Sequence, residues 1–580
     1  MSGTKKRATL CAIVLCALSL AACGGGGGGG GGNGSASVTS FEIVDPSPAA
    51  GEEFSRGIVI LSSGNIVVTD PLDSNVAPFA GAAYLYNPVT QTRIASIYGD
   101  LANDLLGLDG VTALANGNFT IASSRVAAVG IGATVGSVML LNGTTGAQIG
   151  SAIAGDDLAD QLGDKGVVAL TNGNFVIVSQ RDDVNGVIDA GSVRLVDGTT
   201  GIQIGAPIAG NHTDALFNPN VTALTNGNFV VAAPNADVNA VATAGSVMLI
   251  NGTTGAQIGS TIAGDNVNDR LGSDGVAALA NGNYVIASAG DDVNGITNAG
   301  SVMLVDGATG IPIGTPIAGD ENDDQLGSEG VTALTNGNYV IASRLDDVAG
   351  IFDAGSAKLV NGTTGIQVSS IDGDNDFDFL GSRGVIALTN GNYVIASPSD
   401  DVNGIGDAGS VRLVDGTTGI QIGSTIAGDQ LSDSLGFRVA ALTNGHFAIA
   451  SPSDDVNGIV DAGSVMLVDG ATGTQIGTTV ASDNTGDQLG LNSLTAIANG
   501  NFVVVSRLDD VNGIIDAGSV MVISGSTGDP IGNTIAGATP FDLNGAVVAA
   551  SSTRSFFVLG LPLWDNNGLV DSGRVLVTVP

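Results

Sequence analysis

The chain of 580 residues is poor in the side chains on which most enzyme active sites and transition-metal centres depend. It contains two histidines, His212 and His446, and three cysteines, all within the first 23 residues. The rest of the chain can therefore form neither a disulfide nor a cysteine-ligated metal site. No phosphate-binding loop or histidine cluster is present, and we interpret each histidine as a tolerated surface substitution. These absences argue against an enzymatic function. They also mean that the sequence establishes no cofactor.

Positively charged residues are also scarce. The chain has 18 lysines and arginines but 56 aspartates and glutamates, which gives a formal net charge of −38. A surface of this sign repels the phosphates of nucleic acids and the head groups of anionic lipids. We therefore expect no nucleic-acid partner and no membrane contact beyond a lipid anchor. The same charge favours cations or a basic partner, and it keeps a large domain soluble as a monomer.

Aromatic residues make up only 4% of the chain, whereas 43% of it is hydrophobic and 89 residues are glycine. This composition suits many short strands that pack closely with little bulky core. The single tryptophan, Trp564, lies in an atypical region near the end of the chain. Two interpretations of it stay open, because it can pack where the fold closes or serve as an exposed binding residue.

Residues 1–22 resemble a bacterial lipoprotein signal peptide. Basic residues 5–7 precede an apolar stretch, residues 10–20, which is too short to span a bilayer. The sequence Leu-Ala-Ala-Cys then ends at Cys23 and is similar to a lipobox. The resemblance implies cleavage before Cys23 and lipidation of that cysteine, and several acyl chains on one residue give stable anchoring. The alternative is an ordinary secretory signal with a chance cysteine.

The residues after Cys23 predict a tether. Residues 24–32 are an unbroken glycine run, and we assign residues 23–37 to a lipidated cysteine and flexible linker with a reach of roughly 20 Å. Aspartate at the position after the cysteine generally retains lipoproteins at the inner membrane, and here that position is Gly24. In a Gram-negative host, we therefore expect an exported protein anchored to the outer membrane. Residues 38–580 form the folded domain.

One stretch, residues 330–355, recurs along almost the whole chain. Its asparagine in a predicted turn, Asn336, has counterparts at steps of 54 to 56 residues, namely Asn116, Asn172, Asn226, Asn281, Asn390, Asn444 and Asn499. Two degenerate copies, near residues 63–65 and 556–558, extend the series to ten units. Self-similarity at this period indicates a repeat architecture.

Each unit has four short apolar runs separated by turn signals. In the unit quoted above these runs are residues 331–334, 339–343, 356–360 and 366–370. Asn336-Gly337 predicts a two-residue hairpin loop between the first two runs. The runs are apolar on both faces, so both faces of each sheet should be covered. Four antiparallel strands per unit, each sheet lying between its neighbours, predict an all-β propeller. A β-solenoid is the alternative, although its coils are usually shorter.

The landmarks within the units resemble a known repeat. The first unit reads GEEFSRG from Gly51, GNIVVTDP from Gly64 and AGAAYLY from Ala80. A later unit has Leu380-Gly381 and then VIASP from Val394. These landmarks are similar to those of the FG-GAP repeat of integrin-α-type propellers, and the resemblance covers about residues 40–580. It implies a propeller fold and a role in recognition, although a fold-level analogy cannot name the ligand.

The two ends of the repeat region predict how the ring closes. The tenth unit ends after its third strand, residues 574–579, and a strand-like run, residues 38–44, precedes the first unit. The N-terminal run can supply the missing fourth strand, so we expect one ring of ten blades. Two rings of five blades are the alternative. The turn at residues 307–310 argues against it, because it pairs the fourth strand of unit five within its own blade.

Two kinds of aspartate-rich loop should share one face of the ring. One is the DDVNGxxD loop between the second and third strands, and the other is the GDxxxDxLG connection between blades. Hard oxygen ligands in the first loop could bind calcium, with the carbonyl of Val187 as a further ligand. The side chains proposed for these sites are Asp183, Asn185 and Asp189; Asp401, Asn403 and Asp407; Asp455, Asn457 and Asp461; and Asp510, Asn512 and Asp516.

The alternative for these loops is that aspartate and asparagine only cap turns through their own side chains. We prefer this second interpretation. The FG-GAP comparison adds that integrin-type units bind calcium in a DxDxDGxxD loop between the first and second strands. The short Asn-Gly-Asn turn at that place leaves no room for such a loop.

Taken together, these observations predict a non-enzymatic envelope lipoprotein that presents an acidic loop face to an unknown protein or glycan, as a binding or adhesion module. One alternative is a hydrolase with its site in the central channel. Another is a structural spacer of the envelope with calcium-stabilised loops. A hydrolase would require one unit to depart from the others with a convergent set of polar residues, and the units that do depart gain no catalytic set.

Overall fold

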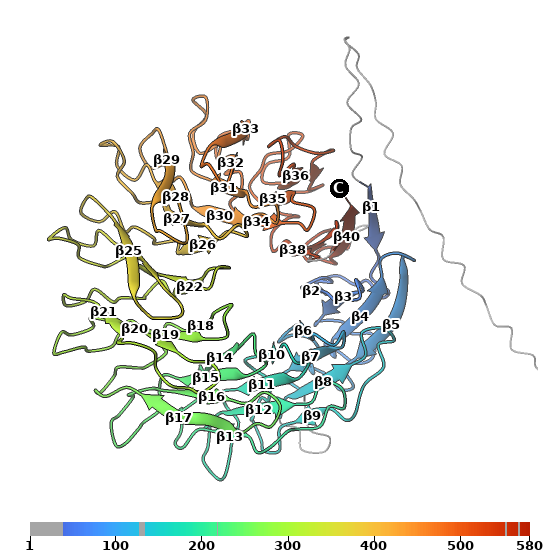
Figure 1. Ribbon diagram of the computed structural model, residues 1–580. Coiled ribbons are helices and arrows are strands. Elements are labelled where there is room, and N and C mark those ends of the chain that lie inside the picture. Colours follow the sequence, from blue (N-terminus) through green and yellow to red (C-terminus); the bar gives the residue numbers. More distant parts are fainter. Residues whose placement is uncertain (1–38, 127–133, 217, 552–553, 566–568, 580) are drawn as a thin grey trace, which may run out of the picture.

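The computed structural model describes residues 39–126, 134–216, 218–551, 554–565 and 569–579. These residues form forty strands in ten four-stranded antiparallel sheets, with no helix among them. The sheets are blades arranged one after another around an open centre (Figure 1). The predicted propeller of ten blades is therefore confirmed. None of the described segments is a helix long and apolar enough to cross a membrane. Cys23 and the predicted tether lie outside the described residues.

Blades 1 to 5 follow one another along the first half of the ring. Their strands are, for blade 1, β2 (Gly57–Ile60), β3 (Ile66–Asp70), β4 (Ala82–Asn87) and β5 (Thr92–Tyr98); for blade 2, β6 (Val111–Ala113), β7 (Phe119–Ser123), β8 (Ser137–Leu141) and β9 (Ile153–Ala154); for blade 3, β10 (Val167–Ala169), β11 (Phe175–Ser179), β12 (Ser192–Val196) and β13 (Ile208–Ala209); for blade 4, β14 (Asn220–Ala223), β15 (Phe229–Ala233), β16 (Ser246–Ile250) and β17 (Gln257–Ala263); and for blade 5, β18 (Val276–Ala278), β19 (Tyr284–Ser288), β20 (Ser301–Val305) and β21 (Ile317–Ala318).

Blades 6 to 10 complete the circle. Their strands are, for blade 6, β22 (Val331–Ala333), β23 (Tyr339–Ser343), β24 (Ser356–Val360) and β25 (Gln367–Asp372); for blade 7, β26 (Val385–Ala387), β27 (Tyr393–Ser397), β28 (Ser410–Val414) and β29 (Gln421–Ala427); for blade 8, β30 (Arg438–Ala441), β31 (Phe447–Ser451), β32 (Ser464–Val468) and β33 (Gln475–Ala481); for blade 9, β34 (Ser493–Ala496), β35 (Phe502–Ser506), β36 (Ser519–Ile523) and β37 (Ile535–Ala536); and for blade 10, β38 (Val547–Ala550), β39 (Phe557–Leu561), β40 (Arg574–Val579) and β1 (Thr39–Ile43).

The second strand of each blade explains why the blades stack. All five residues of β23 are buried, and the same holds for its counterparts in the other blades. Successive side chains of a strand point to opposite faces, so a fully buried strand needs a covered sheet on both sides. The apolar clusters accordingly join neighbouring blades, as where Val285 and Val302 of blade 5 meet Tyr339 and Ile341 of blade 6.

The ring closes as the two chain ends predict. β1 pairs antiparallel with β40, from Thr39 opposite Val579 to Ile43 opposite Val575. The innermost strands of consecutive blades are in contact, and β2 of blade 1 contacts β38 of blade 10. There is thus one ring rather than two. Trp564 is buried among apolar residues of blades 9 and 10, and the guanidinium carbon of Arg574 lies 4.8 Å from its ring centroid. Of the two interpretations of Trp564, packing next to the closing blade is the one the structure supports.

The Asn-Gly hairpins differ in detail from the predicted two-residue loop. In blade 2 the N–H of Gly117 donates to the carbonyl of Leu114, and the N–H of Leu114 donates to the carbonyl of Asn118. Gly117 has a φ of 89°, whereas Asn116 keeps a negative φ. This is a three-residue loop in which glycine takes the left-handed position of a bulge. The sequence pattern predicted the place of the hairpin correctly and its loop type wrongly.

The same hairpins also bind each blade to the next. In eight blades the Nδ2 of an asparagine in this turn donates to a glycine carbonyl in the third-to-fourth hairpin of the following blade, at 2.7 to 2.8 Å. The pairs are Asn65 with Gly143, Asn116 with Gly198, Asn172 with Gly252, Asn226 with Gly307, Asn281 with Gly362, Asn336 with Gly416, Asn390 with Gly470 and Asn444 with Gly525. At the closing interface Arg554 of blade 10 donates instead to the carbonyl of Ser63, at 2.9 Å.

We predict that Asn336→Asp destabilises the ring. The change replaces the donor to Gly416 with an oxygen that repels this carbonyl, while the other oxygen of residue 336 still accepts from the N–H of Asn338. Loss of a partly buried hydrogen bond should lower the free energy of unfolding by about 1 kcal/mol, measured by denaturant titration.

Asn499→Asp is the matched control for this substitution. Asn499 has the same place in blade 9, but blade 10 takes its fourth strand from the N-terminus and has no third-to-fourth hairpin to receive the bond. Equal losses of stability in the two variants would contradict a role for the bond between blades.

Candidate functional site

The two kinds of aspartate-rich loop meet on one face of the ring, as predicted. In blade 3 the connection from β9 to β10 brings Asp156 and Asp160 to Asp182, which follows β11. One carboxylate oxygen from each of the three lies within 4.8 Å of the others. We call such a group an acidic triad. Three further triads are Asp265, Asp269 and Asp291; Asp320, Asp324 and Asp346; and Asp374, Asp378 and Asp400.

The residues proposed as calcium ligands from the sequence take part in turns. In blade 3 the N–H of Asp189 donates to Oδ1 of Asp183 at 2.7 Å. Asn185 has a φ of 54° and lies in a tight turn between Val184 and Val187, which exchange both backbone hydrogen bonds. The corresponding residues of the three other loops have the same contact and the same positive φ, namely Asp401, Asn403 and Asp407; Asp455, Asn457 and Asp461; and Asp510, Asn512 and Asp516. These contacts support the turn interpretation, and calcium binding by these residues stays a prediction.

Within a triad most carboxylate oxygens already have hydrogen-bond donors. Asp160 is fully buried and accepts from the N–H of Asp157 at 2.7 Å and from the N–H of Asp183 at 3.3 Å. Asp182 is also fully buried and accepts from the hydroxyl of Ser192. The first of these aspartates therefore caps the connection between blades, and the second holds the start of the third strand. The sequence showed both motifs but not that they converge.

Three of these triads contain a basic side chain from the third strand of their blade. The ion pairs are Arg194 with Asp182 at 2.7 Å, Arg412 with Asp400 at 3.1 Å, and Lys358 with Asp346. Other blades have methionine at this position, for example Met303 in blade 5 and Met521 in blade 9. Basic side chains of the protein therefore offset the negative charge of only some of the triads.

Burial raises the pKa of several triad aspartates, both with a basic partner, as for Asp400, and without one. The pKa of Asp291 in blade 5 is raised by burial and by the neighbouring charges of Asp269 and Asp265, although the hydroxyl of Ser301 opposes this shift. In blade 9 burial, together with Asp487 and Asp483, raises the pKa of Asp509 to about 6. A raised carboxyl pKa makes the folded state less stable as pH rises through that value.

We predict that Met521→Arg stabilises the protein at pH 8. The arginine would stand next to Asp509, as Arg194 stands next to Asp182, and should add on the order of 1 kcal/mol to the free energy of unfolding. Because the folded-state pKa of Asp509 is raised to about 6, the gain should be present above pH 6 and disappear towards pH 4, where Asp509 is protonated. Thermal unfolding at both pH values measures it.

Met248→Arg in blade 4 is the control for this prediction. Blade 4 has Asn211, Ala215 and Ala236 at the three triad positions, so the new arginine would find no carboxylate there. A gain of the same size in Met248→Arg would contradict the proposed pairing with Asp509.

Blade 1 carries a different acidic cluster. Asp45 follows β1, Glu52 lies in the connection to β2, Asp70 ends β3 and Asp73 lies in the loop to β4. All four side chains are buried, and one oxygen each from Asp45, Glu52 and Asp70 lies within 4.8 Å of the others. Burial and the three neighbouring carboxylates raise the pKa of Asp70 to about 9, and burial raises the pKa of Asp45 to about 6.

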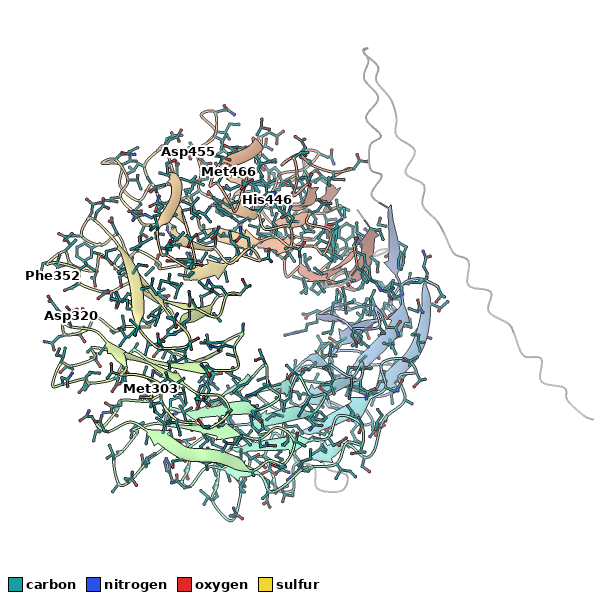
Figure 2. The ribbon with its side chains drawn as sticks, viewed as in Figure 1. Met303, Asp320, Phe352, His446, Asp455 and Met466 are labelled. Carbon is teal, nitrogen blue, oxygen red and sulfur yellow. The ribbon has the colours of Figure 1, made fainter. Side chains whose placement is uncertain are left out.

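Large apolar side chains are exposed on the same face as the triads. Phe352 in the β23–β24 loop and Phe377 in the connection to blade 7 are 62% and 55% exposed, and the N–H of Phe377 donates to the carbonyl of Phe352. Phe352 lies at the outer edge of the ring (Figure 2). Other exposed residues of these loops are Ile188, Leu431, Val460, Ile515 and Phe541.

Basic side chains gather at one place on the innermost strands. A hollow of about 340 Å³ is lined by Arg383, Phe437, Arg438 and Asn492, among others from blades 7 to 9. The guanidinium carbon of Arg383 lies 4.2 Å from the ring centroid of Phe437. The lining contains no histidine, cysteine or carboxylate among the residues of blades 7 to 9 that form it. It offers no general base or activated nucleophile of the usual kinds.

Comparison with known proteins finds a family model that matches the repeats but indicates no function. Seven stretches, in blades 3 to 9, match the model of a family described as "Repeat of unknown function (DUF5650)": residues 169–206, 223–269, 278–315, 333–375, 387–427, 441–485 and 496–531. No curated protein matches the chain.

Two solved structures are similar to the chain at a low level. The crystal structure of the computationally designed Ika8 protein has a TM-score of 0.35 and 16% identity, over 70% of this chain and 93% of that one. The crystal structure of BamB from Moraxella catarrhalis has a TM-score of 0.35 and 11% identity, over 72% of this chain and 96% of that one. Likeness of this degree gives no information about ligand or partner.

Proposed function

We propose that the chain is a non-enzymatic binding module of the bacterial cell envelope, which docks a protein or glycan on the face formed by the acidic loops. A ring of blades is an architecture for binding or scaffolding, and the ligand must be sought in its surface. The observation that carries the proposal is the combination, on this one face, of exposed apolar side chains with carboxylates.

Single exposed apolar residues are ordinary on protein surfaces, so their arrangement matters more than their number. Phe352 and Phe377 are adjacent, because a backbone hydrogen bond joins them, and Phe377 packs near Phe379 with 6.0 Å between the ring centroids. Asp376 accepts from the N–H of Phe352 at 3.0 Å. An aromatic pair beside a carboxylate fits a partner that presents apolar groups next to basic ones. A glycan would instead stack on the exposed rings.

Anchoring at the envelope follows from the N-terminal sequence. The lipobox-like sequence ending at Cys23 and the linker to residue 37 precede β1, so the tether joins the ring at the blade where it closes. A linker of this length would hold the ring near a membrane without fixing its orientation. We place the anchor in the outer membrane because Gly24, not aspartate, follows the cysteine. The resemblance to FG-GAP repeats supports recognition in the same way.

The absence of enzymatic activity is part of the proposal. His446 stands in the Asn-Gly hairpin of blade 8, on the face opposite the triads, and His212 accepts a hydrogen bond from the N–H of Asp237 at 3.2 Å. The repeated aspartates serve as turn caps within their blades. A hydrolase would need one blade to combine an acid, a base and a substrate pocket, and the arginine-lined hollow of blades 7 to 9 offers a different chemistry.

The binding face can be tested with residues 24–580 and intact cells of the producing bacterium. We expect the double variant Phe352→Ser, Phe377→Ser to lose at least about tenfold in affinity, because each change removes an exposed apolar anchor of a contact surface. Raising the salt concentration should also weaken binding, since the face is acidic.

The control is Ile366→Ser, Ile420→Ser. Both isoleucines are 67% exposed but lie in third-to-fourth hairpins on the opposite face. This variant should bind as the unchanged protein does. If the two variants lose affinity equally, or the unchanged protein does not bind to cells at all, the acidic face is not a docking surface and a structural spacer becomes the better interpretation.

A further inference from the structure

The acidic cluster of blade 1 departs from the repeat at one position. In seven other blades the last residue of the second strand is serine, whose hydroxyl accepts a hydrogen bond from a glycine N–H in the connection between blades. These serines are Ser123, Ser179, Ser288, Ser343, Ser397, Ser451 and Ser506. Blade 1 has Asp70 at this place, and it puts a fully buried carboxylate where the other blades have a neutral hydroxyl.

Four carboxylate oxygens of this cluster are buried without a hydrogen-bond partner. They are Oδ2 of Asp45, Oε2 of Glu52 and both oxygens of Asp70. The second oxygens of Asp45 and Glu52 accept from the N–H groups of Ser47 at 2.9 Å and Ser74 at 3.3 Å. These backbone bonds orient the two side chains and leave one oxygen of each without a donor. Buried polar atoms are rarely left without a partner, because each costs about 1 to 3 kcal/mol.

The repeat offers a direct comparison. In the triad of blade 3 the buried aspartates receive donors from backbone, serine or arginine, as Asp182 does from Ser192 and Arg194. In blade 7 only Oδ1 of Asp400 lacks a donor, and Arg412 pairs with its Oδ2. Among the described residues, no lysine, arginine or histidine forms an ion pair with Asp45, Glu52, Asp70 or Asp73. The blade 1 cluster thus combines four buried carboxylates with no internal cation to offset their charge.

We propose that Asp45, Glu52 and Asp70 bind a divalent cation of the calcium class at the point where the ring closes. The four free oxygens are hard ligands, two from Asp70 and one each from Asp45 and Glu52, and calcium prefers six to eight such oxygens, with water completing the set. The absence of histidine and cysteine from the cluster favours calcium or magnesium over zinc.

Asp73 supports this site from beside it. Its Oδ2 accepts from the hydroxyls of Ser47, at 2.9 Å, and Tyr84, and its Oδ1 accepts from the N–H of Asn75 at 2.7 Å. Asp73 has the place in blade 1 that Asp182 has in blade 3, whereas Tyr84 has the place of Arg194. Blade 1 therefore lacks the basic residue that blades 3, 6 and 7 have at this position, and a bound ion would supply the positive charge.

A cation here would join segments that the chain reaches from opposite directions. Asp45 comes two residues after β1, which completes blade 10, whereas Asp70 belongs to blade 1. In the same connection the N–H groups of Gly51 and Glu53 donate to the carbonyls of Val570 and Asp571 of blade 10. Binding of the ion would stabilise the attachment of β1 and, with it, the closed ring.

The site can be tested on the full chain, purified in detergent and stripped with EDTA. Calorimetric titration with CaCl₂ should detect one site per chain, and saturating calcium should raise the melting temperature. Asp70→Ser restores the residue of seven other blades and should weaken calcium binding at least about tenfold while raising the melting temperature of the metal-free protein. MgCl₂ and ZnCl₂ titrations test the predicted preference for a hard cation.

Asp265→Asn is the matched control, because it alters a triad that has no internal cation and leaves blade 1 unchanged. It should keep the calcium site of the unchanged protein. If Asp70→Ser does not fold, Glu52→Gln provides the same measurement through a different ligand. The proposal is overturned if the unchanged chain binds no calcium at millimolar concentration, or if Asp265→Asn abolishes binding and the blade 1 variants retain it.

Discussion

The structure depends on one constraint, which is that both faces of every blade are apolar and have to be covered. The second strand of each blade is buried throughout, and the apolar clusters extend from one blade into the next. A row of such blades would expose an apolar sheet at each end, so only a closed ring satisfies them all. The asparagine-to-glycine hydrogen bonds add a polar link at eight of the junctions, where a hairpin of one blade meets a hairpin of the next.

Closure makes the junction of blades 10 and 1 unlike the other junctions. It is the place where the first described strand meets the last, where the link on the hairpin face comes from Arg554, and where buried carboxylates lack donors. The other junctions join similar blades and resemble one another. A site that occurs once in the ring is therefore expected where the sequence departs from the repeat, as it does at this junction. The tether inferred from the sequence, residues 23–37, joins the ring at this same blade.

Much of the fold could be predicted from the sequence because it follows from periodicity. The predicted strands at residues 339–343 and 356–360 coincide with β23 and β24, and the closing strand lies within the predicted residues 38–44. The hairpin loop type was wrong, since asparagine followed by glycine fits both a two-residue loop and a bulged one. The bond from Asn336 to Gly416 joins residues 80 positions apart, and a local pattern could not reveal it.

The candidate site was predictable only in part. The sequence correctly placed both aspartate-rich loops on one face, but it offered Asp183, Asn185 and Asp189 as ligands, which the structure engages in turns. The convergence of Asp160 with Asp182 depends on how neighbouring loops pack. Asp70 was visible as a departure from serine, yet its meaning depends on burial and on the missing donors around it. A residue that departs from the repeat indicates a site only when the burial and the hydrogen-bond partners of its position are known.

A cation bound in blade 1 would hold the ring closed, and hydrogen exchange of the closing strands measures this effect. Amide exchange should be followed in residues 39–45 and 574–579, with residues 331–372 of blade 6 as the internal reference, in EDTA and in calcium. We expect calcium to slow exchange in the two closing segments and to leave exchange in blade 6 unchanged. Equal protection throughout the ring, or no change at the closing segments, would contradict it.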